Sequence, residues 1–299
     1  MGMRKIILGT DWFTDCDDAV AIRLITNAVK NKTIQLLGIG INVCMKYSVA
    51  SLKGFLNADG IKNVPIGIDF EAIESEEESS YQKRLMENFC PLGSNEDGED
   101  AVRLYRRLLA NEQGNVEIVE IGHPQVLANL LKSKADDISP KSGYELVQEK
   151  VLKLWVMAGK WDADGEKEYN FCRNARSRLG GKELCELCPC PITFLGFEIG
   201  SGVITGGKLN KNDHLYKVLC DHGSENGRHS WDPMLVVMAL IGNEEVAGYH
   251  TVTGTASVDE QTGANYFKKE PNGKHKYVIK IHENDYYEKQ INSMINKLL

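Results

Sequence analysis

Four aspartates, Asp11, Asp15, Asp17 and Asp18, stand close together near the start of the chain. They follow a short apolar run and precede the apolar segment 19–25, a pattern that predicts a strand, a loop and the first turn of a buried helix. Neighbouring carboxylates repel one another when ionised, and a helix N-terminus offsets part of that repulsion. Their oxygens are the ligands that calcium and magnesium prefer. The stretch predicts a cation site; the alternative is a solvated acidic loop with one aspartate as helix cap.

The segments around this stretch alternate between strand-like and helix-like patterns. Apolar runs at 6–8, 34–43 and 64–68 predict strands, and helical spacing occupies 17–30 and 48–59. Further strands are expected at 116–121, 151–157 and 191–197, with helices at 101–109 and around 127–131. This order predicts one Rossmann-like, doubly wound, mostly parallel sheet with helices on both faces, whose functional loops lie at the carboxyl ends of the strands.

The second half of the chain adds one strong helix signal. Asp232 as N-cap and Pro233 as the first helical residue mark the start of an apolar helix that extends to Ile241. Beyond residue 246 the pattern alternates, and the turn residues 271–273 precede a strand at 277–281, which predicts a terminal hairpin. An amphipathic helix is expected at about 285–299.

The length of 299 residues and the absence of a linker signal predict a single domain over residues 1–299. Residues 71–99 are rich in glutamate and serine, which predicts a solvated, mobile insertion or a lid over the site. The net charge of −7 argues against nucleic-acid binding. The first residues contain too short an apolar run for a signal peptide, and no stretch approaches the length of a membrane span. We therefore expect a cytoplasmic protein with no membrane partner.

Three of the eight cysteines, Cys185, Cys188 and Cys190, crowd together, with Cys172 nearby in the sequence. A structural zinc site usually takes four ligands from two separated pairs, and the second pair is missing here. Reduced thiols are the preferred interpretation and zinc the alternative.

The acidic stretch and five later segments, in the same order, resemble the inosine-uridine-preferring nucleoside hydrolases. That family begins with a strand and the pattern Asp-x-Asp-x-x-x-Asp-Asp, and Asp11, Asp17 and Asp18 match its first, third and fourth acids. The strand that ends at Ile121 resembles the family strand whose last carbonyl binds calcium. Three further segments, 156–159, 191–194 and 231–233, match other family segments, and the sixth, 168–170, resembles the family's Glu-Phe-Asn. The resemblance covers about residues 5–241.

The resemblance implies a role for each matched residue. Metal binding falls to Asp11, Asp18, Asp232 and the Ile121 carbonyl, with Ca²⁺ as the cofactor, and the extra acid Asp15 is added to this set as a further candidate ligand. Asp17, Glu168 and Asn170 would bind ribose hydroxyls, and Trp231 resembles the aromatic residue of the purine-preferring branch, which stacks on the base. The alternative for Trp231 is a plain core aromatic residue.

One family position is changed. The family's second loop aspartate, which ligates calcium and activates water, falls on Phe13, and Asp15 is an extra acid two residues later. Asp11 and Asp15 are therefore the candidate catalytic acids, together with Trp231 at the base. Trp12 and Phe13 are expected to form an apolar wall for the sugar or to pack beneath the loop.

These features predict calcium-dependent hydrolysis of the N-glycosidic bond of purine-leaning nucleosides, which yields ribose and a free base. The alternatives are a hydrolase of another ribosyl or glycosyl compound, and a ligand-binding protein that kept the pocket without turnover. The expected partner is a small nucleoside or ribosyl substrate, and the resemblance favours a homodimer or a homotetramer.

Overall fold

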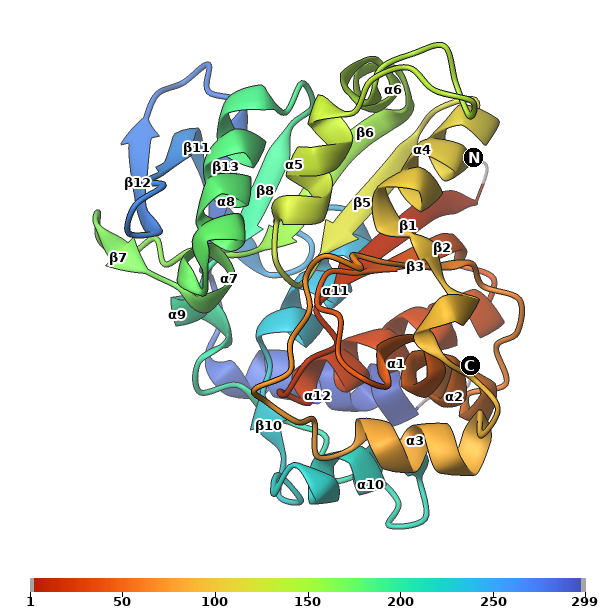
Figure 1. Cartoon of the computed structure of the whole chain (residues 1–299). Helices are drawn as coiled ribbons and strands as arrows, with labels where there is room; N and C mark the ends of the chain where they lie inside the picture. The colour runs from red at the N-terminus through yellow and green to blue at the C-terminus, as the bar shows by residue number, and fades with distance from the viewer. Residues whose placement is uncertain (1–2, 297–299) are drawn as a thin grey trace.

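A mostly parallel eleven-stranded sheet forms the centre of the molecule (Figure 1). The structure is a computed structural model that describes residues 3–296. The strand order is β4-β3-β2-β1-β5-β6-β8-β13-β11-β12-β7, and a separate small pair joins β9 to β10. The strands are β1 (Arg4–Thr10), β2 (Ile34–Ile41), β3 (Ile66–Ile68), β4 (Glu99–Asp100), β5 (Val116–Glu120), β6 (Val151–Met157), β7 (Glu166–Lys167), β8 (Ile192–Leu195), β9 (Ile204–Thr205), β10 (Arg228–His229), β11 (Tyr249–Val258), β12 (Ala264–Lys269) and β13 (His275–Lys280).

Helices cover both faces of the sheet (Figure 1). They are α1 (Asp17–Lys30), α2 (Ser48–Ala58), α3 (Gln82–Phe89), α4 (Ala101–Asn111), α5 (Gln125–Lys132), α6 (Gly143–Lys150), α7 (Tyr169–Cys172), α8 (Ala175–Leu187), α9 (Phe197–Gly200), α10 (His214–Asp221), α11 (Trp231–Ile241) and α12 (Asn284–Asn296), with a 3-10 turn at Asn95–Asp97. Successive residues of a strand point to opposite faces, so that Ile6 and Leu8 join one apolar core and Ile7 joins the other. Burial on both faces explains why the parallel strands are almost entirely apolar.

The strand order reverses direction at β1. The next strand in the chain, β2, pairs with one edge of β1, whereas β5 pairs in parallel with the other edge. The loops that follow β1 and β5 therefore leave the sheet on either side of a crevice at its carboxyl end, where open α/β sheets bind their ligands. The predicted doubly wound fold is confirmed, and its topology places the acidic loop 11–16 beside Ile121.

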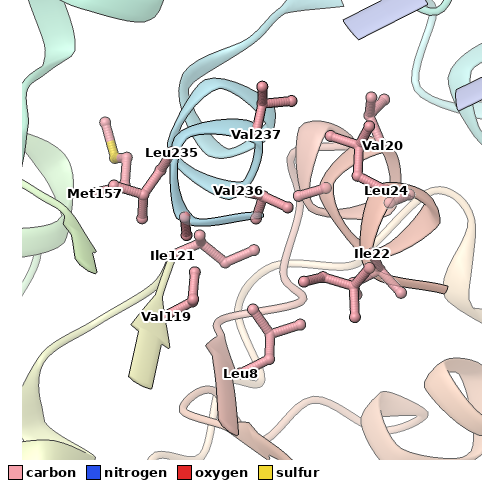
Figure 2. Packing of buried hydrophobic residues seen from close by; sticks show 14 of the residues in the cluster. Leu8, Val20, Ile22, Leu24, Val119, Ile121, Met157, Leu235, Val236 and Val237 are labelled. Atoms are coloured by element: carbon pink, nitrogen blue, oxygen red, sulfur yellow. The ribbon is translucent and has the colours of Figure 1, made fainter. Parts of the chain in front are cut away.

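Helix α11 packs between α1 and the carboxyl ends of β5 and β6 (Figure 2). Its Val236 and Val237 lie toward Val20 and Leu24 of α1, and Leu235 lies toward Met157. The helix is apolar on nearly every side because it is enclosed by these neighbours. This packing fixes the N-terminus of α11 beside the N-terminus of α1.

Two predicted boundaries differ from the structure at this helix and at the end of the chain. Helix α11 begins at Trp231 with Ser230 as N-cap, so Asp232 and Pro233 lie within its first turn. Proline is tolerated there because a backbone N–H in the first turn has no partner within the helix. The predicted hairpin is also different, because β12 and β13 both pair with β11 and not with each other. Instead, β13 extends the sheet in parallel beside β8. The last helix is confirmed over 284–296, and residues 297–299 of the prediction lie outside the described residues.

The segment 71–99 contains more structure than its composition predicts. Helix α3 packs against α2, with Tyr81 and Leu85 fully buried, whereas residues 74–79 are mostly exposed. The two buried apolar residues were hidden in the sequence by the surrounding polar residues.

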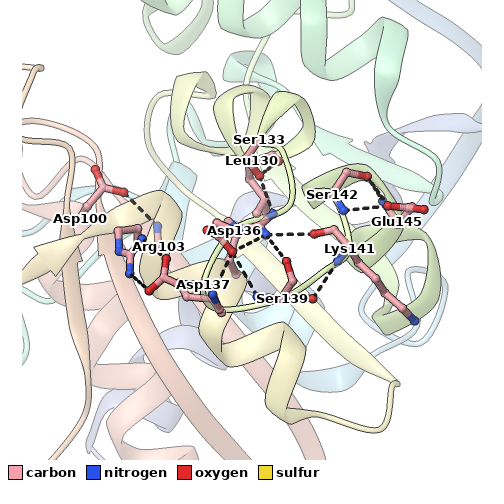
Figure 3. Close-up of polar contacts among 12 residues, drawn as sticks. Asp100, Arg103, Leu130, Ser133, Asp136, Asp137, Ser139, Lys141, Ser142 and Glu145 are labelled. Carbon is pink, nitrogen blue, oxygen red and sulfur yellow. Dashed lines mark hydrogen bonds and ion pairs between the residues drawn. The ribbon is translucent and has the colours of Figure 1, made fainter.

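Polar contacts also fix the segment that connects α5 to α6. Figure 3 shows the exposed pair of Arg103 with Asp137 and the capping box of Ser142 with Glu145 at the start of α6. The buried guanidinium of Arg106 also binds Asp136, at 2.7 and 2.8 Å. Within residues 3–296 no helix is long and apolar enough to cross a bilayer.

Candidate active site

The acidic loop follows β1 and has an unusual backbone at Trp12. This residue has a φ of 45°, a left-handed conformation that costs about 1–3 kcal/mol for a bulky residue. Its backbone N–H donates to the Thr10 hydroxyl at 3.1 Å and faces Asp18 Oδ1 at 3.3 Å, and its indole N–H donates to Ser51 at 2.8 Å. The indole is fully buried, so Trp12 packs beneath the loop. The sharp turn carries the chain from the strand end toward the first turn of α1.

Residues at the start of α3 hold the same loop from the other side. The Gln82 amide donates to the Trp12 carbonyl at 2.5 Å. The buried Tyr81 hydroxyl lies within hydrogen-bond distance of the carbonyls of Phe13 and Asp15, at 3.2 and 2.9 Å. The segment predicted as a mobile insertion therefore contributes two side chains that fix the backbone of the acidic loop.

Three carboxylates meet at the N-termini of two helices. Asp17 and Asp18 begin α1, Asp232 lies in the first turn of α11, and one oxygen from each lies within 4.8 Å of the others. The backbone N–H of Asp232 donates to Asp17 at 3.2 Å, and Thr10 donates to Asp18. The positive ends of both helix dipoles favour negative charge here. Asp17 and Asp18 are neighbours in the sequence, whereas Asp232 joins them only because α11 packs beside α1.

Burial is the largest cause of the raised pKa values of Asp11, Asp17, Asp18 and Asp232. Desolvation and the neighbouring carboxylates raise the pKa of Asp11 to about 8. Desolvation, followed by the charges of the adjacent aspartates, also raises the pKa values of Asp17, Asp18 and Asp232 well above the ordinary value. All four side chains are nearly inaccessible to solvent. Without a cation, the site holds protons that exposed aspartates would have lost.

The donor set fits a hard divalent cation. It consists of carboxylate oxygens together with the carbonyl end of β5 at Ile121, which lines the same cavity. Behind them the buried Glu120 has one oxygen, Oε2, without a hydrogen-bond partner within residues 3–296. Burial raises the pKa of Glu120 to about 8. Buried acids in this number, without a paired base among them, are typical of a site that binds a positive ion.

Asp15 has a different environment from the other three loop acids. Its carboxylate accepts from Arg228 Nε at 2.9 Å and from Arg228 Nη2 at 2.6 Å, and His222 Nε2 lies 3.8 Å away. Burial acts to raise the pKa of Asp15, but the hydrogen bonds and charge of Arg228 outweigh it and lower the pKa. Asp15 is also about one third exposed. Its predicted roles as metal ligand and base stay predictions, and the ion pair favours a role in which Asp15 positions the Arg228 guanidinium.

Glu168 and Asn170 face the group of aspartates from the loop that ends in α7. Glu168 accepts from the N–H groups of Gly159 and Asn170, each at 2.9 Å, and the Asn170 amide donates to the Met157 carbonyl at 2.9 Å. Burial raises the pKa of Glu168 to about 7. The amide and carboxyl are therefore fixed by backbone groups at the end of β6.

An aromatic pair forms another wall. The rings of Trp231 and Phe197 stack with centroids 5.2 Å apart and an interplanar angle of 22°. The Trp231 indole N–H donates to the Phe197 carbonyl at 2.8 Å. Both rings are partly exposed, which contrasts with the core alternative for Trp231. Together these groups enclose a cavity of about 360 Å³ lined by Asp11, Phe13, Thr14, Asp15, Asp17, Asp18, Ile121, Met157, Glu168, Tyr169, Asn170, Phe197, Arg228, Trp231 and Asp232.

The cavity therefore collects every residue that the sequence predicted for the site. It also contains residues that sequence reasoning missed, above all Phe197 and Arg228. Phe197 is the last residue of the predicted strand 191–197, and its place at the carboxyl end of a strand was an available signal, whereas nothing local marks Arg228 as a partner of Asp15. His123, left unassigned from the sequence, is buried with neither ring nitrogen hydrogen-bonded within the part of the chain that the structure describes. Burial lowers its pKa to about 3, so the ring is neutral.

Phe13, at the position of the missing family aspartate, is nearly buried. It packs with Val43 and Met45 in a small apolar cluster and also lines the cavity. The Arg173 guanidinium lies 4.3 Å from its ring centroid and binds Glu74 in the exposed segment 74–79. An apolar ring thus stands where the family has an acid.

Solved structures with the same architecture align with this chain over nearly its whole length. An inosine-guanosine nucleoside hydrolase matches with a TM-score of 0.71 and 14% identity, covering 98% of this chain and 99% of that chain. The chain has the nucleoside hydrolase fold. A purine-preferring ribonucleoside hydrolase from Gardnerella vaginalis gives 0.71 and 14%, with 99% of both chains covered. An inosine-uridine-preferring nucleoside hydrolase from Bacillus anthracis gives 0.68 and 13%, with 98% and 99% covered.

No family model and no curated protein matches the sequence. The resemblance found in the acidic loop and the five later segments is confirmed at the level of the nucleoside hydrolase fold. The site of this chain must be judged on its own residues, because identities of 13–14% transfer no activity.

Proposed function

We propose that the protein is a calcium-dependent N-ribohydrolase that cleaves purine nucleosides to ribose and a free base. The observation that carries this proposal is one cavity with buried carboxylates on one side and a stacked aromatic pair on another. The carboxylates suit a cation and sugar hydroxyls, and the aromatic pair suits a planar base. The nucleoside hydrolase fold supports the same reaction class.

The cation would be held by Asp11, Asp18, Asp232 and the Ile121 carbonyl. A bound calcium ion would orient a water molecule and lower its pKa. Asp15 is outside this proposed set because its carboxylate already binds Arg228. The buried group of aspartates, whose pKa values are raised without a cation, supports the assignment.

The sugar would be held beside the cation. Asp17, Glu168 and Asn170 would bind ribose hydroxyls and place the anomeric carbon near the attacking water. Asp11 lines the cavity beside Asp18 and would accept the proton of that water, a role for which Asp15 was the other candidate. The bond between the anomeric carbon and the base nitrogen then breaks, and its electron pair leaves with the base.

The base would stack on Trp231 and Phe197. Stacking of a base on an aromatic side chain is worth about 1–3 kcal/mol. The base would then lie against the aromatic wall of the cavity, while the sugar contacts the polar residues. The predicted homodimer or homotetramer stays a prediction.

The test is release of reducing sugar from a panel of purine and pyrimidine nucleosides, with calcium and then with chelator. We expect calcium-dependent release of ribose, fastest with purine nucleosides. The matched variants are Asp11→Asn and Asp15→Asn: the first should remove turnover, whereas the second should retain calcium binding and part of the turnover. Binding of nucleosides without any sugar release would instead support a ligand-binding protein.

A further inference from the structure

A positive charge lies at the base-binding end of an otherwise acidic cavity. Arg228 of β10 lines the cavity, and its guanidinium carbon lies 5.4 Å from the ring centroid of Trp231. Its side chain is 29% exposed and is therefore partly accessible to solvent. The guanidinium thus lies over the ring on which the proposed function places the base, at a distance from the centroid that leaves it toward the edge of that ring.

The orientation of this guanidinium is fixed by Asp15. The carboxylate binds Nε and Nη2 side by side, in the two-point geometry that suits an arginine and a carboxylate. The hydrogen bonds that Arg228 donates within residues 3–296 use these two nitrogens, which leaves Nη1 and the outer hydrogen of Nη2 for a ligand. A guanidinium that is held in this way offers parallel N–H donors at low entropic cost.

We propose that Arg228 reads the edge of a 6-oxopurine base by donating to its O6 and N7 atoms. This inference rests on the proposed function, because it takes Trp231 as the stacking surface. Arginine pairs with O6 and N7 of guanine through two N–H donors, and hypoxanthine presents the same two acceptors. Adenine presents N7 beside an amino group, whose hydrogens would meet the guanidinium donor to donor. The substrate class is therefore inosine and guanosine in preference to adenosine.

The same contact assists the chemistry. When the glycosidic bond breaks, the electron pair passes to the base nitrogen and spreads over the ring to N7 and O6. Donors already aimed at these atoms stabilise the charge that develops. Arg228 keeps its proton throughout, and the released base takes a proton from solvent. Arg228 is thus a specificity-determining residue that also contacts the leaving group.

The test measures binding and turnover separately, in calcium. Binding of the free bases hypoxanthine and adenine is measured by calorimetry, which requires no hydrolysis. We expect the wild-type protein to bind hypoxanthine about 10-fold to 100-fold more tightly than adenine, the range of one two-point contact to a base edge. The ratio of kcat/KM for inosine over adenosine should follow the same order.

Three variants make the test specific. Arg228→Met should remove the discrimination. Arg228→Gln should reverse it, because a glutamine amide pairs with N6 and N7 of adenine. Arg103→Gln is the matched control, since this arginine also binds an aspartate, Asp137, but lies outside the cavity lining (Figure 3). It should leave both affinities unchanged, and melting curves check that each variant is folded.

The outcomes separate this inference from the proposed function. Equal affinity of the wild-type protein for the two bases, or unchanged discrimination in folded Arg228→Met, overturns the inference even if nucleosides are hydrolysed. Discrimination that depends on Arg228, in a protein that releases no ribose from any nucleoside, supports the inference and overturns the proposed hydrolysis.

Discussion

Replacement of Asp232 by asparagine should stabilise the protein in chelator and remove most of its stabilisation by calcium. The oxygens of Asp17, Asp18 and Asp232 lie within 4.8 Å of one another. At an effective dielectric constant of about 20, an ionised pair at this separation repels by about 3.5 kcal/mol. At pH 9 in chelator, where more of these acids are ionised, Asp232→Asn removes part of this repulsion and should be about 3 kcal/mol more stable than the wild-type protein.

The melting temperature converts this energy into a measurement. A chain of 299 residues has an unfolding entropy of about 0.6 kcal/mol/K, so 3 kcal/mol corresponds to about 5 °C. Calcium at about 100 times its dissociation constant should stabilise the wild-type protein by about 2.7 kcal/mol. This stabilisation corresponds to a rise in the melting temperature of about 4 °C. Asp232→Asn should lose most of this calcium response.

Asp15→Asn is the matched variant for differential scanning calorimetry. It removes a carboxylate from the same loop, but this carboxylate binds Arg228. We expect Asp15→Asn to lower the melting temperature in chelator and to retain the calcium response. A variant Asp232→Asn that is less stable than the wild-type protein in chelator, or a calcium response lost equally in both variants, would refute the reasoning.

Three further predictions concern the walls of the site. Burial raises the pKa of Glu168 from its ordinary value to about 7, so this acid alone should lower the stability by about 3 kcal/mol as pH rises from about 4.5 to 7. The other buried acids add a decline of the same sign, so in urea unfolding of the metal-free protein Glu168→Gln should lose about 3 kcal/mol less over this pH range than the wild-type protein. A Cβ at Gly122 would lie 2.3 Å from the backbone nitrogen of Asp11, so Gly122→Ala should cost about 1–3 kcal/mol and weaken calcium binding, measured by calorimetry. Trp231→Ala should weaken binding of a purine base by about 1–3 kcal/mol, whereas Trp231→Phe should retain most of the affinity; equal losses would contradict a stacking role.

The sequence predicted those parts of the fold that are locally encoded. Helix α1 has the predicted bounds, because its apolar face and its two leading aspartates lie in one continuous segment. The strands around β1 were predicted from apolar runs that burial on both faces requires. The acidic loop was predicted to be a cation site because charge repulsion is also a local property, and this site stays a prediction.

The parts that could not be predicted depend on contacts between distant segments. Asp15 looked like a fourth carboxylate of the group until the fold placed Arg228, 213 residues away, against it. The strand β13 was assigned to a hairpin because turn residues precede it, but its partners are β8 and β11. Local patterns specify the type of an element, whereas long-range packing decides its neighbours.

The hydrogen bond between Asp232 and Asp17 joins residues that are 215 positions apart in the chain. During synthesis, Asp11, Asp17 and Asp18 therefore leave the ribosome long before the residue that completes their site. At about 5–20 residues per second, roughly 10–50 s pass between the two events. A nascent chain that ends before residue 232 carries Asp11, Asp17 and Asp18 without the carboxylate of Asp232. Tight cation binding should therefore mark a chain that has been synthesised past residue 232, and a bound cation would act late in folding by stabilising the contact between α1 and α11.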